Sequence, residues 1–320
     1  MEQRKLIKLG NSSFAIALPK NWINKSGLKK GDNIFLEENS NGEITMWSKL
    51  KKVADEKIAE IDISDKNASL IRKAIISAYT NGSTLIVLKG KKEKKELGEI
   101  KNFIRSLLSF EIIEASEERI IAKDFFNIEE TSVANFIKRI DNNIKEMFSI
   151  INSAIQKGTL TKKELEDIGA IDIDTTKFYL LISRLFFKGI DNPSVLNALK
   201  KNSLDFFGEW WLSHNLEHLG DQVKEIAKLL NSSKIDENEG KLISKLFSQI
   251  WEGYNSSIQS FYKKDRNTAI ESATRGKEII KCCEKMAQHK NPSLAKLGII
   301  FKELETNSYQ NLKMVMYSRI

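Results

Sequence analysis

Cysteine, histidine and proline are scarce in this sequence, whose 320 residues include two cysteines, three histidines and three prolines. The cysteines, Cys282 and Cys283, are adjacent. Adjacent residues rarely bridge, because a disulfide needs Cα atoms about 5.5 Å apart in suitable geometry. The spacing does not match a zinc site either. We therefore expect buried or idle thiols on a helix.

Long apolar runs are also missing. No run approaches the roughly 18 to 20 residues that a bilayer-spanning helix requires. The charged start, Met1–Lys5, has no apolar stretch of signal-peptide length behind it. We expect a cytoplasmic protein.

The few histidines also bear on catalysis. No Ser/His/Asp or Cys/His pairing stands out around His214, His218 or His289. We expect no enzyme. A metal-assisted hydrolase built on Glu217, Asp221 and His218 is the alternative, but the helical pattern places these residues on a face open to water.

The net charge of +8 is unevenly distributed. Residues 1–52 carry ten Lys/Arg against five Asp/Glu, whereas residues 53–124 carry thirteen of each. Over half of the surplus thus lies in the first sixth of the chain. A compact basic segment favours a polyanionic partner, because each neutralised phosphate releases a counterion.

The first fifty residues alternate between apolar and polar positions. This pattern predicts four short strands at Arg4–Leu9, Phe14–Leu18, Asn33–Glu38 and Glu43–Trp47. Gly10–Ser13 predicts the first turn, and residues 39–42 join the last two strands. Pro19 suits the start of a short helix over Lys20–Ser26, which Gly27 closes. The expected order is ββαββ.

So small a unit cannot bury enough apolar surface by itself. Its apolar positions are Leu6, Phe14, Ile16, Leu18, Trp22, Ile23, Leu28, Ile34, Leu36 and Ile44. Interleaving with a second copy would cover them, so we expect a homodimer.

The segment contains Arg4-Lys5, Gly10-Asn11-Ser12-Ser13, Leu18-Pro19-Lys20, Trp22 and Gly27-Leu28-Lys29-Lys30-Gly31-Asp32. Through this combination of motifs it resembles the SpoVT/AbrB family. The resemblance implies a domain-swapped β-barrel homodimer that binds DNA. The form of the turn is more similar to the archaeal and antitoxin branch than to the bacterial transition-state regulators.

The resemblance also implies which residues contact DNA. They are Arg4, Lys5, Lys8, Asn11, Ser12, Ser13 and Lys20. Their cations would lie on phosphates or groove edges, and the amide and hydroxyls could reach bases. Lys25, Lys29 and Lys30 are either phosphate contacts or a solvated rim. The dense arginines of the bacterial regulators are lacking.

Residues 53–124 predict a small α/β sandwich of order βαβαββ. The expected strands are Ala59–Ile63, Thr84–Leu88, Glu111–Ala115 and Arg119–Lys123, with helices at Ala68–Asn81 and Lys94–Ser109. Neither a catalytic constellation nor a phosphate-binding glycine loop appears in it. The charge run Lys89–Lys95 is either a DNA contact or a solvated loop.

Residues 125–320 read as helix almost throughout. The expected helices are Ile128–Lys157, Lys162–Lys188, Ser203–Leu230, Lys241–Lys264, Arg266–Gln288 and Ser293–Tyr317. A polar stretch at Asn231–Gly240 divides them into two groups of three, about 125–231 and 238–320. Equal groups suggest an internal duplication.

One helix face in the first group is acidic. At about 100° per residue, one arc of that helix holds His214, Glu217, His218, Asp221 and Glu225. The carboxylates at i, i+4 and i+8 repel one another. Lys228 lies inside the arc and Lys224 just outside its edge, so the repulsion is offset least at Glu217. The pattern is either an ordinary polar face or a site for a bound cation.

The same helix contains Leu216–Asp221 with Glu225–Ala227, and the preceding helix contains Asp172–Thr176. Through these motifs residues 125–320 resemble the PhoU family. The resemblance implies a divalent or iron-type metal ion held by Glu217, Asp221 and Asp172, with His218 as a further ligand. Thr176 replaces the family's second aspartate. In the second repeat, Asn307 replaces an aspartate near Glu303–Glu305, so we expect that site to have decayed.

The expected architecture is thus a multidomain α+β protein. A SpoVT/AbrB-like barrel (1–52) and a small α/β domain (53–124) precede a PhoU-like pair of three-helix bundles (125–320). This order resembles archaeal phosphate-uptake regulators, which implies a DNA-binding regulator of phosphate uptake with a helical sensor. The alternative is an interaction protein that docks on a phosphate transporter or its signalling kinase. An antitoxin would leave the helical part unexplained.

Overall fold

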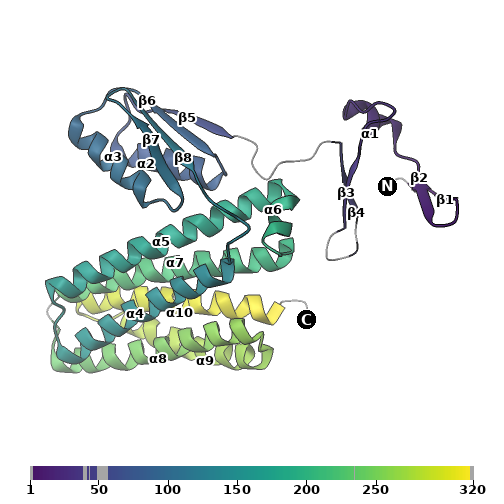
Figure 1. Cartoon of the computed structure of the whole chain (residues 1–320). Helices are drawn as coiled ribbons and strands as arrows, with labels where there is room; N and C mark the ends of the chain where they lie inside the picture. The colour runs from purple at the N-terminus through teal and green to yellow at the C-terminus, as the bar shows by residue number, and fades with distance from the viewer. Residues whose placement is uncertain (1–2, 39–41, 43, 49–56, 234, 318–320) are drawn as a thin grey trace. The chain divides into compact units, whose positions relative to one another are not determined.

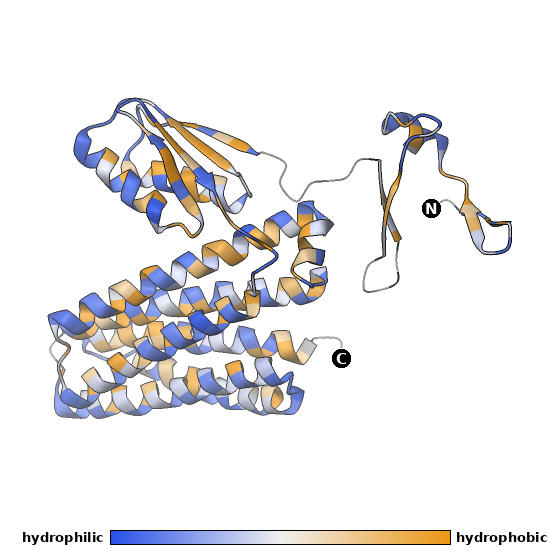
Figure 2. Ribbon diagram, in the orientation of Figure 1, coloured by the Kyte–Doolittle hydropathy of each residue, from blue (hydrophilic) through white to orange (hydrophobic). Residues whose placement is uncertain are grey.

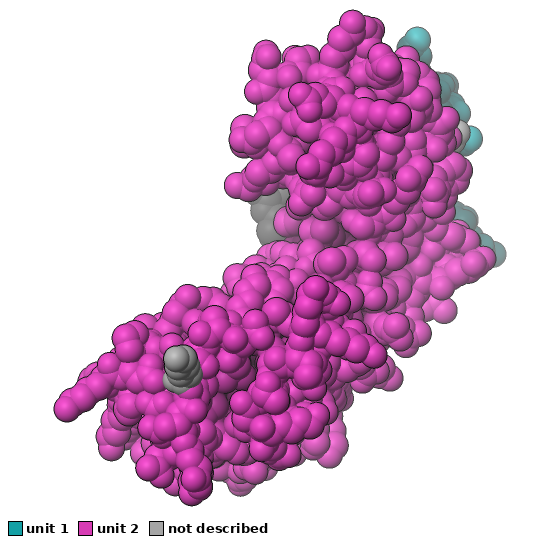
Figure 3. All heavy atoms as spheres, turned by 90° about the vertical axis from the view of Figure 1, so that its left-hand side faces the viewer, with its two compact units in different colours: residues 1–55 teal, residues 56–320 magenta. Residues whose placement is uncertain are grey.

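A computed structural model describes residues 3–38, 42, 44–48, 57–233 and 235–317. The chain divides into two compact units, residues 1–55 and 56–320, which Figure 3 colours separately. The boundary expected between residues 52 and 53 lies outside the described residues.

The first unit consists of two antiparallel hairpins and one short helix. Strand β1 (Leu6–Leu9) pairs with β2 (Ser13–Ile16), with Leu6 opposite Ile16. Helix α1 (Lys20–Lys25) follows Pro19, and the chain leaves it through Gly27 at φ +66°. Strand β3 (Phe35–Glu38) pairs with β4 (Ile44–Trp47). This is the expected ββαββ order; of the predicted loop and strand ends, residues 39–41 and Glu43 lie outside the described residues.

The first unit has no interior of its own. Among residues 3–36, 42 and 44–48, whose exposure the structure describes, none is buried, and α1 contains no buried side chain. Leu6, Phe14, Leu36 and Ile44 each leave more than 60% of their surface exposed. The two hairpins form separate two-stranded sheets and do not close a barrel within one chain.

The second unit begins with a four-stranded sheet in the order β5-β6-β8-β7 (Figure 1). Its strands are β5 (Ile58–Asp62), β6 (Leu85–Lys89), β7 (Phe110–Ala115) and β8 (Arg119–Asp124). β5 runs parallel to β6, and the other pairs are antiparallel. Helices α2 (Ala68–Thr80) and α3 (Lys94–Ser106) bury Ile75 and Ile100 in a core with Ile86. The element order matches the sequence prediction.

The rest of the second unit is helical. Its helices are α4 (Val133–Lys157), α5 (Lys162–Asp191), α6 (Pro193–Ala198), α7 (Ser203–Ser232), α8 (Glu237–Lys263), α9 (Arg266–Met286) and α10 (Pro292–Tyr317). Capping boxes at Thr161–Glu164 and Asp236–Glu239 start α5 and α8, and Gly158 ends α4 at φ +71°. The six long helices match the prediction, whereas the short α6 was not predicted.

One apolar core runs through all the long helices, and Figure 2 shows apolar residues on their facing sides. Phe148 of α4 stacks on Phe247 and Tyr254 of α8, with ring centroids 5.2 and 5.5 Å apart. The two predicted groups of three helices therefore share a core, and the predicted PhoU-like pair of three-helix bundles is not confirmed.

A buried arginine joins the sheet to the helices. Arg184 of α5 is fully buried, pairs with Asp124 at the end of β8, and donates to the Tyr79 carbonyl oxygen at 2.5 Å. Its guanidinium lies 5.0 and 5.1 Å from the ring centres of Tyr79 and Phe110. A buried cation needs such partners, so this contact fixes α5 against the sheet.

In the part of the chain that the structure describes, no helix combines the length and apolar content needed to traverse a bilayer.

Candidate functional site

The residues predicted to contact DNA lie on one hairpin and on the helix after it. All are exposed: Arg4 and Lys5 before β1, Lys8 on it, Asn11 and Ser12 in the turn, Ser13 on β2, and Lys20 at the start of α1. Gly10, at φ +69°, makes this turn possible, because side chains rarely adopt that backbone conformation. Lys25, Lys29 and Lys30 are exposed as well. The first unit thus presents cations and hydrogen-bonding groups to solvent.

The acidic face of α7 does meet the preceding long helix. The Lys224 ammonium lies 2.5 Å from Asp172 Oδ2 on α5 and 2.8 Å from Asp221 Oδ1. The Thr176 hydroxyl donates to Glu217 Oε1 at 3.4 Å. Three of the four predicted metal ligands, Glu217, Asp221 and Asp172, are therefore brought near one another.

Glu217 is the unusual member of this group. Burial raises its pKa to about 7, and the Asp221 and Asp172 carboxylates add to the shift. The Thr176 hydroxyl and Lys224 oppose it, but they do not cancel it. The sequence correctly placed the least compensated charge at Glu217. Glu217 itself is half-buried, whereas His218 and Asp221 on the same face are exposed to water, as expected.

The arrangement does not fit a metal ion. The sequence position of Lys224 places it outside the acidic arc. In the structure its ammonium group nevertheless pairs with two of the predicted ligands, Asp172 and Asp221. His218 is exposed, and its ring packs against His214 with centroids 4.7 Å apart. Among the described residues, no three His, Cys, Asp or Glu side chains converge as metal ligands do. The metal ion stays a prediction that the geometry does not support.

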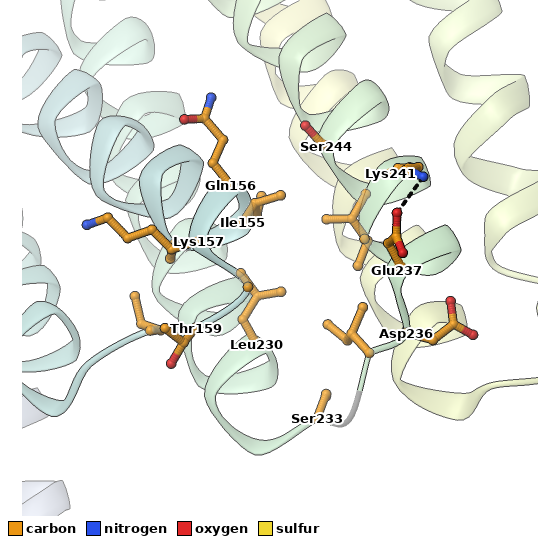
Figure 4. A pocket seen from close by; sticks show the side chains of 16 residues that line it. Ile155, Gln156, Lys157, Thr159, Leu230, Ser233, Asp236, Glu237, Lys241 and Ser244 are labelled. Carbon is orange, nitrogen blue, oxygen red and sulfur yellow. Dashed lines mark hydrogen bonds and ion pairs between the residues drawn. The ribbon is translucent and has the colours of Figure 1, made fainter.

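Another hollow lies at the end of the helical part where α4 leads into α5 and α7 into α8 (Figure 4). Its volume is about 680 Å³, and its rim includes Lys157, Asp236 and Lys241. Lys241 pairs with Glu237 at 2.7 Å, and Lys157 lies 3.6 Å from a Glu164 oxygen. Because these lysines already have acidic neighbours, the hollow shows no built anion site.

A second carboxyl group with a raised pKa was not expected from the sequence. Glu305 of α10 is buried, and that burial raises its pKa to about 7. Its neighbours are Gly253 and Gly276, on α8 and α9. The sequence signal for it is the position of Glu305 in the second-repeat motif, which predicts a decayed metal site.

Comparison with known proteins bears on the first unit. Residues 7–55 match the family model described as "Antidote-toxin recognition MazE, bacterial antitoxin". Residues 7–55 form a MazE/AbrB-type domain. The match covers less than a sixth of the chain, so it does not classify the rest. Neither the curated proteins nor the solved structures contain a match to the chain.

The MazE/AbrB-type domain agrees with the resemblance that the sequence showed. It includes four of the seven predicted DNA contacts on its hairpin, Lys8 and Asn11–Ser13, together with Lys20. Such a domain is compatible with a DNA-binding regulator.

Proposed function

We propose that the protein is a homodimeric DNA-binding transcriptional regulator whose helical part is PhoU-like and links DNA binding to phosphate uptake. The MazE/AbrB-type domain at residues 7–55 is the observation that carries this proposal.

The dimer is supported by the missing interior of the first unit. Leu6 and Phe14 on one hairpin, and Leu36 and Ile44 on the other, remain exposed in a single chain. Removing apolar surface from water contributes about 25 cal/mol per Å², and a domain of this size has few other sources of stability. Interleaving the hairpins of two copies would bury these side chains and close the barrel.

DNA binding is supported by the positive charge of the first unit and by the exposure of its predicted contact residues. Ten Lys/Arg lie in residues 1–52 against five Asp/Glu, and the predicted contact residues are exposed. In a dimer the two hairpins would present the same cations twice. The affinity of such a surface falls steeply with salt, because binding releases counterions from the phosphates.

The phosphate link rests on the resemblance of residues 125–320 to PhoU. The six long helices and their shared core are compatible with a PhoU-like domain. A ligand that binds one state of that domain better than another would change the DNA affinity of the attached dimer, and DNA would change the affinity for that ligand by the same factor.

The proposal is tested by titrating labelled duplex DNA with the full chain at rising salt. We expect binding to weaken steeply with salt, and Lys5→Glu combined with Lys20→Glu to abolish it. Lys277→Glu with Lys285→Glu is the matched control, since it reverses two exposed lysines of the helical part and should retain binding. If the wild-type chain does not bind duplex DNA at low salt, the proposed regulator function is contradicted. Mapping bound genomic DNA with and without phosphate then tests the phosphate link.

A second candidate is an interaction protein that docks on a phosphate transporter or signalling kinase. It is favoured by aromatic side chains at the surface of α5 and α7. Phe187 and Phe207 are each 38% exposed, and the Phe207 ring lies 6.0 and 6.2 Å from those of Trp210 and Trp211. Exposed aromatic groups are enriched in protein interfaces. Two results together would favour this candidate. The full chain would not bind duplex DNA, and the aromatic surface of α5 and α7 would bind a transporter component specifically.

A further inference from the structure

Glu305 is a buried carboxyl, one oxygen of which is unpaired in the part of the chain that the structure describes. It is 2% exposed, and its Oε2 atom has no hydrogen-bond partner among the described residues. Buried polar atoms are almost always satisfied, and leaving one without a partner is unfavourable. An atom left in this state points to a ligand that is bound there in use.

Two glycines keep the space around this carboxyl open. A Cβ atom at Gly276 of α9 would lie 2.6 Å from Glu305 Oε1, and one at Gly253 of α8 would lie 2.9 Å from Oε2. Both distances are too short for real contacts. Alanine is the better helix former, so each glycine weakens its helix at a position where a side chain would fill the cradle.

The cradle opens into a cavity of about 250 Å³ between α8 and α9. Glu305 is at its buried end, while Glu252 and Glu278 line it as exposed side chains. Ile279 and Cys282 also line the cavity, and Cys282 is exposed. The one lining cation, Arg275, is exposed and has its guanidinium 3.4 Å from the Ser272 hydroxyl.

The chemistry of this lining selects its ligand. Carboxylates at the buried end and at the rim attract positive charge, and apolar side chains between them favour a short hydrocarbon chain. A metal ion does not fit, because no three ligating side chains converge anywhere in the described residues. An ammonium group suits a single carboxylate, since it is a compact cation with three donors and needs no fixed coordination shell.

We propose that this cavity binds an aliphatic diamine. One ammonium group donates to Glu305, the methylene chain packs along Ile279 and Cys282, and the second ammonium faces Glu252 or Glu278 at the rim. This ligand site does not depend on DNA binding or on the acidic face of α7. Its test can therefore fail or succeed whatever the outcome for the proposed function.

The test is calorimetric titration of the full chain with putrescine, beside the diol of the same length at matched ionic strength. We expect putrescine to bind with one site per chain and the diol not to bind. Glu305→Gln, which keeps the shape but removes the charge, should weaken binding at least tenfold. Gly276→Ala should do the same by filling the cradle.

Matched controls separate this site from general effects. Gly240→Ala on α8 has open space around the new Cβ, and Glu303→Gln removes an exposed carboxylate from α10. Both should bind putrescine as the wild type does. Cys282 gives a second measurement, because it is exposed while Cys283 is buried, so alkylation reports on the cavity wall. Putrescine should slow this alkylation at least threefold in the wild type and not in Glu305→Gln.

The proposal is overturned by no putrescine binding at millimolar concentration, by binding that survives Glu305→Gln, or by equal binding of the diol. Binding of Mn²⁺ alone to the same cavity, lost in Glu305→Gln, would likewise overturn it in favour of a metal site.

Discussion

The Lys224 ammonium of α7 lies 2.5 Å from Asp172 Oδ2 of α5, and so supplies a positive charge where the sequence predicted a metal ion. The same ammonium lies 2.8 Å from Asp221. One lysine thus neutralises two carboxylates from different helices, and a nearby third, Glu217, is left with a raised pKa. The acidic group is held together by a cation that belongs to the chain.

Replacing this lysine tests its role in stability. Lys224→Met keeps the length of the side chain but leaves Asp172, Asp221 and Glu217 without a nearby cation. Breaking a buried pair from one side costs about 3–5 kcal/mol, and partial exposure of these groups reduces this to about 1–3 kcal/mol. Urea denaturation at pH 8 should show this loss, and a smaller loss at pH 5. Lys228→Met, on the exposed surface one turn further on, should change stability by less than about 0.5 kcal/mol.

The same variant tests the predicted metal ion. If the ammonium occupies the place of a cation, Lys224→Met should bind Mn²⁺ at least tenfold more tightly than the wild type does. Adding Asp221→Ala to that variant should remove the gain. Elemental analysis of the purified wild type, beside Glu217→Ala with Asp221→Ala, completes the comparison. A metal that is present in the wild type and lost in the double variant would restore the predicted site.

Local signals made most of the helical part predictable. Gly158 ends α4, and Thr161 with Glu164 caps the start of α5. These helix boundaries are therefore determined by a few neighbouring residues. The short α6 was missed because its six residues are too few to show a helical period. The exposed apolar residues of the first unit were equally predictable, since a fifty-residue segment cannot bury them alone.

The site details depend on contacts between distant residues and were therefore not predictable. Asp172 lies 52 positions from Lys224, and only the packing of α5 on α7 shows that the lysine reaches it. The cradle around Glu305 is formed by glycines of two other helices, and neither Gly253 nor Gly276 has a distinctive neighbourhood in the sequence. The sequence shows that Glu305 belongs to the second-repeat motif, but only the packing of the helices shows that it is buried.

Arg184 provides a test of how the sheet is joined to the helices. Arg184→Met removes the pairing with Asp124 and the donation to the Tyr79 carbonyl. Leaving a buried carboxylate without its cation costs about 3–5 kcal/mol, although Asp124 keeps the Ser109 hydroxyl as a donor at 2.8 Å. Chemical denaturation should show a loss of about 3 kcal/mol. In a double-mutant cycle, Asp124→Asn should be strongly coupled to Arg184→Met, and additive losses would contradict direct pairing.

The raised pKa of Glu217 predicts how stability changes with pH. Its ordinary value is 4.5, and Asp221 and Lys224 on α7 face it together with Asp172 and Thr176 on α5. Between pH 4.5 and about 7 the folded chain holds a proton that the unfolded chain has lost, so unfolding becomes easier as pH rises through this range.

Glu217→Gln removes this contribution. The variant should lose less stability than the wild type between pH 5 and pH 8, by about 1–2 kcal/mol after allowance for partial solvent access. Thermal or urea unfolding at both pH values measures the difference. Glu225→Gln changes an exposed carboxylate of the same helix and should leave the pH dependence unaltered. A steeper pH dependence in Glu217→Gln would contradict the assigned direction.

The exposed hairpins of the first unit predict that dimerisation and DNA binding are lost together. Phe14→Glu with Leu36→Glu places two charges on surfaces that are 61% and 64% exposed in one chain and would be buried in a dimer. Sedimentation of the full chain should show twice the chain mass for the wild type and a monomer for this variant. Leu70→Glu with Ile299→Glu alters side chains of similar exposure in the second unit, 51% and 50%, and should remain dimeric. Because a DNA site of paired halves requires two modules, the monomeric variant should also bind duplex DNA at least a hundredfold more weakly. A variant that stays dimeric would place the dimer contact outside the hairpins.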